Sequence, residues 1–301
     1  MAGKINGILL IQENPDYFKL FNNKEKLDAY KERIAKDYNN DAKKILSDVF
    51  TFEEGIVKGS NSFAAVGLAS SRLTTPSQLE PAFRMNPDFF VGVYVDPGFV
   101  LRTNGDSYEP NDFLAKHFTE QVKYRTGKMP TPEVPARISL KGLSVEKGNN
   151  PYYGGLVFAF GEDTEIIFAR EFSHNQPNKK FSVADERGVP IFDINGRREL
   201  YTRDAGLSRL CLGRDSVLGS GVVDLSSSNA CGRLAVVSAE GAQKILTEYQ
   251  AKLAHEKNAI AATLEEKSKN YSIGVIKKVL NEKGLTGTVE SIIIQGLRNS
   301  K

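Results

Sequence analysis

Short apolar runs alternate with Gly, Ser, Asn and Asp throughout residues 138–237. Runs of this length, bounded by turn-forming residues, are typical of short β-strands. Within this segment Asn195-Gly196 separates the runs 189–194 and 197–202. Asn-Gly is the dipeptide that two-residue hairpin turns prefer, because both positions of the turn need a positive φ. The pattern therefore predicts a sheet of many short strands, with an antiparallel hairpin whose tip is Asn195-Gly196.

Two more strands are predicted before this segment. Residues 89–95 form an unbroken run of Phe, Val, Gly and Tyr, which is typical of a strand covered on both faces. Asp96-Pro97-Gly98 follows and has the composition of a turn. Residues 99–102 are apolar again apart from their final Arg. We therefore expect two consecutive strands that meet at Asp96-Pro97-Gly98.

Apolar side chains recur at helical spacing on both sides of the predicted sheet. Residues 24–46 carry them among charged residues, which predicts an amphipathic helix. A second helix is expected after Asn111 or Asp112, since either side chain can cap a helix N-terminus. A long helix is expected over residues 241–269, where one apolar stripe faces Lys and Glu. Its members are Ile245, Leu246, Tyr249, Leu253, Ile260 and Leu264.

These patterns together predict an α+β fold. In it, a mixed, largely antiparallel sheet core carries an N-terminal helix and a helical C-terminal extension. The chain has 301 residues, enough to bury a core without disulfides or a structural metal. We divide it into an α+β core domain, residues 1–240, and a mainly helical extension, residues 241–301. Residues 55–73 and 288–297 fit more than one type of secondary structure.

The apolar runs are too short for a signal-peptide core or a membrane span. The cytoplasm is therefore the expected compartment, and no membrane partner is expected. The chain has two cysteines, Cys211 and Cys231, and they lack the Cys and His spacing of a zinc site. We expect both thiols to be reduced and mostly buried.

The formal net charge of +3 is concentrated near the C-terminus. Residues 241–301 contain ten Lys and Arg against six Asp and Glu, whereas residues 1–240 contain 30 against 31. This surplus is small beside the basic faces of nucleic-acid-binding proteins, and a solvated helix surface gives the same pattern. Contact of this basic tail with nucleic acid is one hypothesis.

The richest cluster of acidic side chains lies around two predicted strand ends and consists of Asp96, Asp106, Glu109 and Asp112. Carboxylates at strand ends hold Mg²⁺ in many phosphoryl-transfer sites, because this hard ion prefers oxygen ligands. The same residue types also form ordinary turns through local hydrogen bonds. The cluster therefore has two interpretations, a Mg²⁺ site centred on Asp96 and simple turn chemistry, of which we favour the second.

Three further residues are candidates for chemistry or for anion binding. His174 lies in a polar loop that a substrate could reach, so it is a candidate general base, although a solvated loop histidine is the simpler interpretation. Ser238 and Gly241 stand between a predicted strand and the C-terminal helix. Free backbone N–H groups at such a junction can hold an anion, although Ser238 as a plain helix cap explains the pattern equally. The common nucleotide-binding loops and serine-nucleophile motifs are absent from the sequence.

Few residues with evident chemistry remain. We therefore expect a non-catalytic cytosolic binding or assembly protein, which contacts a second copy or another protein through the apolar stripe of residues 241–269. Two alternatives stay open. One is a metal-dependent hydrolase or nuclease with an acidic site around Asp96. The other is a nucleic-acid-associated protein that uses the basic tail.

Overall fold

The computed structural model describes residues 19–20, 23–69, 73, 94–185, 187–212, 217–222 and 224–236. It also describes eleven exposed helical residues nearer the C-terminus, which are Thr247, Ala251, Ala254, His255, Asn258, Ala259, Ala261, Ala262, Lys278, Asn281 and Glu282. The predicted apolar stripe, the junction at Ser238 and Gly241, and residues 288–297 lie outside the described residues.

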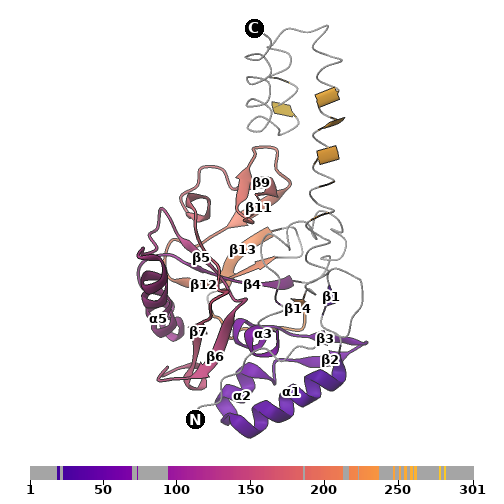
Figure 1. Cartoon of the computed structure of the whole chain (residues 1–301), viewed down its shortest axis with the longest axis vertical. Coiled ribbons are helices and arrows are strands. Elements are labelled where there is room, and N and C mark those ends of the chain that lie inside the picture. The colour runs from indigo at the N-terminus through magenta and orange to yellow at the C-terminus, as the bar shows by residue number, and fades with distance from the viewer. Residues whose placement is uncertain are drawn as a thin grey trace.

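A ten-stranded mixed sheet forms the centre of the fold (Figure 1). Its strands are β1 (Lys19–Leu20), β4 (Tyr94–Arg102), β5 (Ala136–Ser139), β8 (Ile166–Phe168), β9 (Lys180–Ala184), β10 (Pro190–Phe192), β11 (Arg198–Tyr201), β12 (Leu207–Leu212), β13 (Val217–Val222) and β14 (Gly232–Val236). Eight of them follow the order β1-β14-β4-β12-β13-β11-β9-β10, while β5 pairs with β4 and β8 with β5. Most pairings are antiparallel, and β11 with β13 and β14 with β4 run parallel. The α+β class with a mixed, largely antiparallel sheet is therefore confirmed.

Helices and two small ribbons cover this sheet. The helices are α1 (Lys24–Asp37), α2 (Asn40–Leu46), α3 (Ser62–Ala69) and α5 (Glu109–Thr126), with short 3₁₀ turns η3 (Tyr153–Gly155) and η4 (Arg170–Phe172). The ribbons pair β2 (Thr51–Glu53) with β3 (Ile56–Lys58), and β6 (Leu143–Lys147) with β7 (Leu156–Phe160). Residues 55–73 thus contain a strand and a helix. α5 begins at Glu109, just before the predicted capping positions.

The helix predicted over residues 24–46 is in fact two helices. Tyr38 is extended, with φ −126° and ψ 151°, and this ends α1. The Asn39 side chain then accepts a hydrogen bond from the Ala42 N–H at 2.8 Å, which caps the N-terminus of α2. Helical spacing alone does not reveal the break, because α1 and α2 both turn apolar residues toward the core.

Buried apolar residues form two clusters, and β4 contributes to both. All eight residues of α3 are buried, and this helix contacts α2, β4 and β6. Successive residues of a strand point to opposite faces of a sheet. Val100 accordingly belongs to the larger cluster, together with α1, α2, α3 and α5, whereas Phe99 and Leu101 belong to a smaller one with Phe181 and Leu210.

Asp96-Pro97-Gly98 does not end a strand, so the predicted turn between two strands is wrong. The three residues lie inside β4, and the register of β4 with β12 shifts beside them. Gly98 has a φ of 70°, a left-handed conformation that glycine adopts without steric cost. An irregularity of this kind accommodates a proline and a glycine within a continuous strand.

The predicted hairpin at Asn195-Gly196 is also wrong. β10 pairs with β9, β11 pairs with β9 and β13, and β9 lies between β10 and β11. Glycine is needed at position 196 because of a close backbone contact, not because of a hairpin turn. A Cβ on Gly196 would lie 2.3 Å from the backbone N of Phe181 in β9, so only glycine allows this close approach.

Candidate functional site

An open pocket of about 800 Å³ lies between α2 and the loop that joins β6 to β7. One wall comes from residues 38–45, at the junction of α1 and α2, and the other from residues 147–155. This volume is within the range of small-molecule binding sites. The lining includes Tyr38, Asp41, Lys44, Lys147, Tyr152 and Gly154.

The loop wall of the pocket has an uncommon backbone conformation. Tyr153, Gly154 and Gly155 have φ angles of 52°, 64° and 82°, all in the left-handed region. For a non-glycine residue this conformation costs on the order of 1–2 kcal/mol. The Tyr153 hydroxyl donates to Asn111 Oδ1 at 2.5 Å, and its ring packs against Phe63 with 5.2 Å between centroids. Contacts behind the pocket therefore hold its strained wall in place.

The two walls contact each other at Gly154. A Cβ on this residue would lie 2.4 Å from the backbone N of Ala42, so glycine alone permits the contact. Asn150 fixes the start of the loop: its Nδ2 donates to the Leu156 carbonyl at 2.8 Å, and its Oδ1 accepts the Tyr152 N–H at 3.0 Å. The shape of the pocket is therefore set by contacts made directly between its two walls and within its loop.

Two lysines and one aspartate give the pocket its charge. Lys147 Nζ lies 5.0 Å from the centroid of the Tyr38 ring, a cation–π contact. Lys44 Nζ lies 3.4 Å from Asp41 Oδ1, and both side chains are more than two-thirds exposed, so water screens this pair. Burial raises the pKa of Tyr38 to about 12, with Arg33 opposing the shift. Tyr38 is therefore a neutral phenol at physiological pH.

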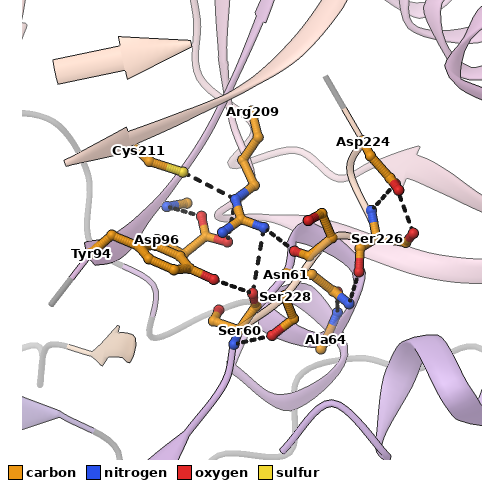
Figure 2. A network of polar contacts seen from close by, with 12 residues as sticks. Ser60, Asn61, Ala64, Tyr94, Asp96, Arg209, Cys211, Asp224, Ser226 and Ser228 are labelled. Carbon is orange, nitrogen blue, oxygen red and sulfur yellow. Dashed lines mark hydrogen bonds and ion pairs between the residues drawn. The ribbon is translucent and has the colours of Figure 1, made fainter. Parts of the chain in front are cut away.

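Asp96 lies in a separate, buried polar network around Arg209 (Figure 2). Its side chain is fully buried, and its Oδ2 is 3.3 Å from Arg209 Nε. Burial raises the pKa of the Asp96 carboxyl, and the Arg209 guanidinium opposes this shift. Arg209 Nε also donates to Cys211 Sγ at 3.1 Å. Burial raises the pKa of the Cys211 thiol as well, so this cysteine lacks the thiolate character of an activated nucleophile.

The Arg209 guanidinium ties separate segments of the chain together. Nη1 donates to the Ser227 carbonyl at 2.6 Å and to the Ser60 carbonyl at 3.4 Å, and the group lies 5.2 Å from the Tyr94 ring centroid. Beside it, Asn61 accepts the Ala64 N–H at 2.8 Å and so caps α3 (Figure 2). The network therefore joins β4, β12, the start of α3 and the loop before β14, which is a structural role.

The other three carboxylates of the predicted metal cluster are explained by local contacts or by exposure. Glu109 accepts the Tyr152 hydroxyl at 2.7 Å, Asp112 accepts Lys116 Nζ at 2.6 Å, and Asp106 is exposed before α5. Among the described residues, no group of three or more His, Cys, Asp or Glu side chains could hold a metal ion. The described structure therefore does not bring these carboxylates together with Asp96.

His174 is half-buried and is attached to a neighbouring strand. Its Nδ1 lies 2.6 Å from the Thr202 carbonyl, and a carbonyl only accepts, so Nδ1 is the donor. This bond holds the loop of His174 against the end of β11. The general-base hypothesis for His174 stays a prediction.

The two thiols differ in exposure. Cys211 is buried and Cys231 is exposed, and both are free. The prediction that both cysteines are mostly buried is therefore wrong for Cys231. Its loop carries Asn229, whose Oδ1 accepts the Cys231 N–H at 2.8 Å and holds the turn at the surface.

In the native protein we expect a thiol reagent such as dithiobisnitrobenzoate to modify Cys231 rapidly and Cys211 only on unfolding. The reason is the burial and raised pKa of Cys211. The Cys231→Ser variant, as a control, should lose the rapid phase. Rapid modification of both thiols in the folded protein would contradict the buried network.

Comparison of the chain with protein-family models, with curated proteins and with solved structures found no match. No helix among the described residues is both long and apolar enough to span a bilayer. Sequence reasoning missed the pocket, although the loop contains the run Asn149-Asn150-Pro151 followed by Tyr-Tyr-Gly-Gly, a composition typical of turns. That local signal does not reveal which distant helix faces the loop.

Proposed function

We propose that this chain is a non-catalytic binding protein that holds a small molecule in the pocket between α2 and the β6–β7 loop. The supporting observation is an open pocket of about 800 Å³ whose strained wall is held in place by contacts outside it. None of the described lining residues is His, Cys or Ser, and the Lys, Asp and Tyr side chains among them can recognise a ligand through charge and hydrogen bonds.

The buried network supports the same proposal. Burial raises the pKa of both Asp96 and Cys211, and the two side chains lie beside Arg209 in a buried network that joins separate segments of the fold. A cytoplasmic location, and a protein or second-copy partner bound through the predicted stripe of residues 241–269, remain parts of this proposal. The metal-dependent alternative lacks converging carboxylates among the described residues.

An uncharged fluorescent dye tests the pocket directly. N-phenyl-1-naphthylamine becomes fluorescent in apolar surroundings, and we expect it to bind saturably at one site per chain. Replacing Ile45, which lines the pocket and is half-buried, by Trp should weaken binding at least about tenfold, because the indole occupies the ligand's space.

The matched control is Ile45→Leu, which conserves side-chain volume and should bind the dye as the unchanged protein does. Circular dichroism and thermal unfolding of both variants verify that each is folded. Equal dye binding by Ile45→Trp and Ile45→Leu would place the dye elsewhere and contradict the proposal.

A further inference from the structure

We infer that the pocket takes a small organic anion with a planar ring, whose negative group is bound by Lys44 and Lys147. This inference rests on the proposed function, since it names the chemical class of ligand for the same pocket. It uses three observations: the charges of the lining, the aromatic residues beside them, and the volume of the pocket.

The first observation is an excess of positive charge. Lys44 and Lys147 approach the pocket from its two walls, and Asp41 is the one acidic residue among the described lining residues. Asp41 is a weak counter-charge, because it lies 3.4 Å from Lys44 Nζ and is 76% exposed. Glu146, next to Lys147, is not part of the lining and accepts a hydrogen bond from the Ser144 hydroxyl at 3.2 Å.

Lys147 has no ion-pair partner within the described part of the chain, and its described contact is the face of Tyr38. A ring face attracts an ammonium group without neutralising it. The described contact with Tyr38 therefore leaves the N–H donors of Lys147 available to a ligand. A carboxylate, sulfonate or phosphate that replaced water there would gain charge-assisted hydrogen bonds from Lys147 and from Lys44.

The second observation concerns shape. Tyr38 and Tyr152 are aromatic residues of the pocket lining, one from each wall. Aromatic rings pack favourably against other planar groups. The third observation, the volume of about 800 Å³, is enough for a small molecule. A planar ring that carries one anionic group satisfies all three.

Two dyes that differ by a single charged group provide the test. 8-Anilinonaphthalene-1-sulfonate is N-phenyl-1-naphthylamine with a sulfonate added. At low ionic strength we expect the anionic dye to bind about tenfold more tightly than the neutral one. Added KCl should reduce this difference, since salt screens exposed charges.

Lys147→Glu should weaken binding of the anionic dye about tenfold. Its affinity for the neutral dye should stay within about twofold of that of the unchanged protein. Lys147→Gln, which removes the charge without reversing it, should give an intermediate effect. The matched control is Lys36→Glu, on the exposed surface of α1 and outside the pocket lining, which makes the same change in net charge. Lys36→Glu should leave the affinity for both dyes unchanged.

Equal affinity for the two dyes, together with no effect of Lys147→Glu, would overturn the inference and leave the proposed function intact. An equal loss of affinity for the anionic dye in Lys147→Glu and Lys36→Glu would also overturn the inference. The dye would then be attracted by the net charge of the protein rather than by Lys147. Failure of the proposed function looks different, since Ile45→Trp would then leave the binding of both dyes unchanged.

Discussion

Arg209→Met is expected to lower the free energy of unfolding by about 3–5 kcal/mol, because it leaves the buried Asp96 carboxyl without its positive partner. The side chains of Arg209 and Asp96 are only 2% and 0% exposed, so water cannot replace the lost charge. The Ser227 carbonyl also loses its donor, whereas the Ser60 carbonyl keeps the Tyr94 hydroxyl at 3.3 Å. Urea unfolding followed by circular dichroism measures the loss.

The loss should depend on pH. Burial raises the pKa of Asp96, and removing the opposing Arg209 guanidinium should raise it further. An acid whose pKa is raised by folding destabilises the folded state progressively as pH rises from its unfolded value toward its folded value. The stability of Arg209→Met should therefore approach that of the unchanged protein as the pH is lowered toward 4.

Two further variants separate the charge from the hydrogen bonds. Adding Asp96→Asn to Arg209→Met should recover part of the loss, because the buried carboxylate has been removed, while the Ser227 carbonyl still lacks its donor. Lys116→Met is the control: it removes the cation of the Lys116–Asp112 pair, whose side chains are 68% and 29% exposed, and should cost much less. Equal losses in Arg209→Met and Lys116→Met would show that the buried pair does not stabilise the fold.

The metal-dependent alternative makes a different prediction for Asp96→Asn. If Asp96 held Mg²⁺, millimolar Mg²⁺ would raise the melting temperature of the unchanged protein, and the Asn variant would lose that rise. The buried pair with Arg209 leads us to expect no Mg²⁺ effect that depends on Asp96. A rise lost in the Asn variant would support the hydrolase or nuclease alternative instead.

Local signals predicted the class of the fold and failed wherever a distant segment decided the outcome. Alternating short apolar runs give a sheet whatever their pairing, so the α+β class was accessible from sequence. The partners of β10 and β11 were not accessible. Asn195-Gly196 does form a local turn, in which the Gly196 N–H donates to the Asp193 carbonyl, but the strands on either side of it both pair with β9. Arg209 stands inside an apolar strand sequence, which indicates a buried charge but does not identify the carboxylate it meets.

The pocket too was predictable only in its local parts, and not in the contact between its distant segments. The turn composition of residues 148–155 is visible in the sequence, and so is the apolar spacing of residues 24–46. Helical spacing does not show that the helix is interrupted at Tyr38 and Asn39, which exposes the first turn of α2 to the loop. The sequence also does not show that glycine is required where Gly154 contacts Ala42. A binding site made by two segments that meet only in the folded chain therefore has no local sequence signature.

Gly154→Ala tests that meeting point. Both the left-handed conformation and the overlap with Ala42 oppose the added methyl group, since φ is 64° and the new Cβ would lie 2.4 Å from the Ala42 N. The first effect costs on the order of 1–2 kcal/mol. The second costs about 1–3 kcal/mol, because backbone must move to relieve it. We therefore expect a total loss of about 2–5 kcal/mol in the free energy of unfolding.

Gly127→Ala is the matched control, because Gly127 has a φ of 69° and no atom within 4 Å of its added Cβ. It should show only the conformational cost, about 1–2 kcal/mol. The difference between the two variants then measures the contact of the loop with α2. Displacement of the loop should also weaken the binding of both naphthyl dyes to Gly154→Ala. Gly127→Ala should bind both dyes as the unchanged protein does. Equal losses of stability would show that the walls do not touch, whereas a larger loss in Gly154→Ala with unchanged dye binding would show that their contact does not shape the pocket.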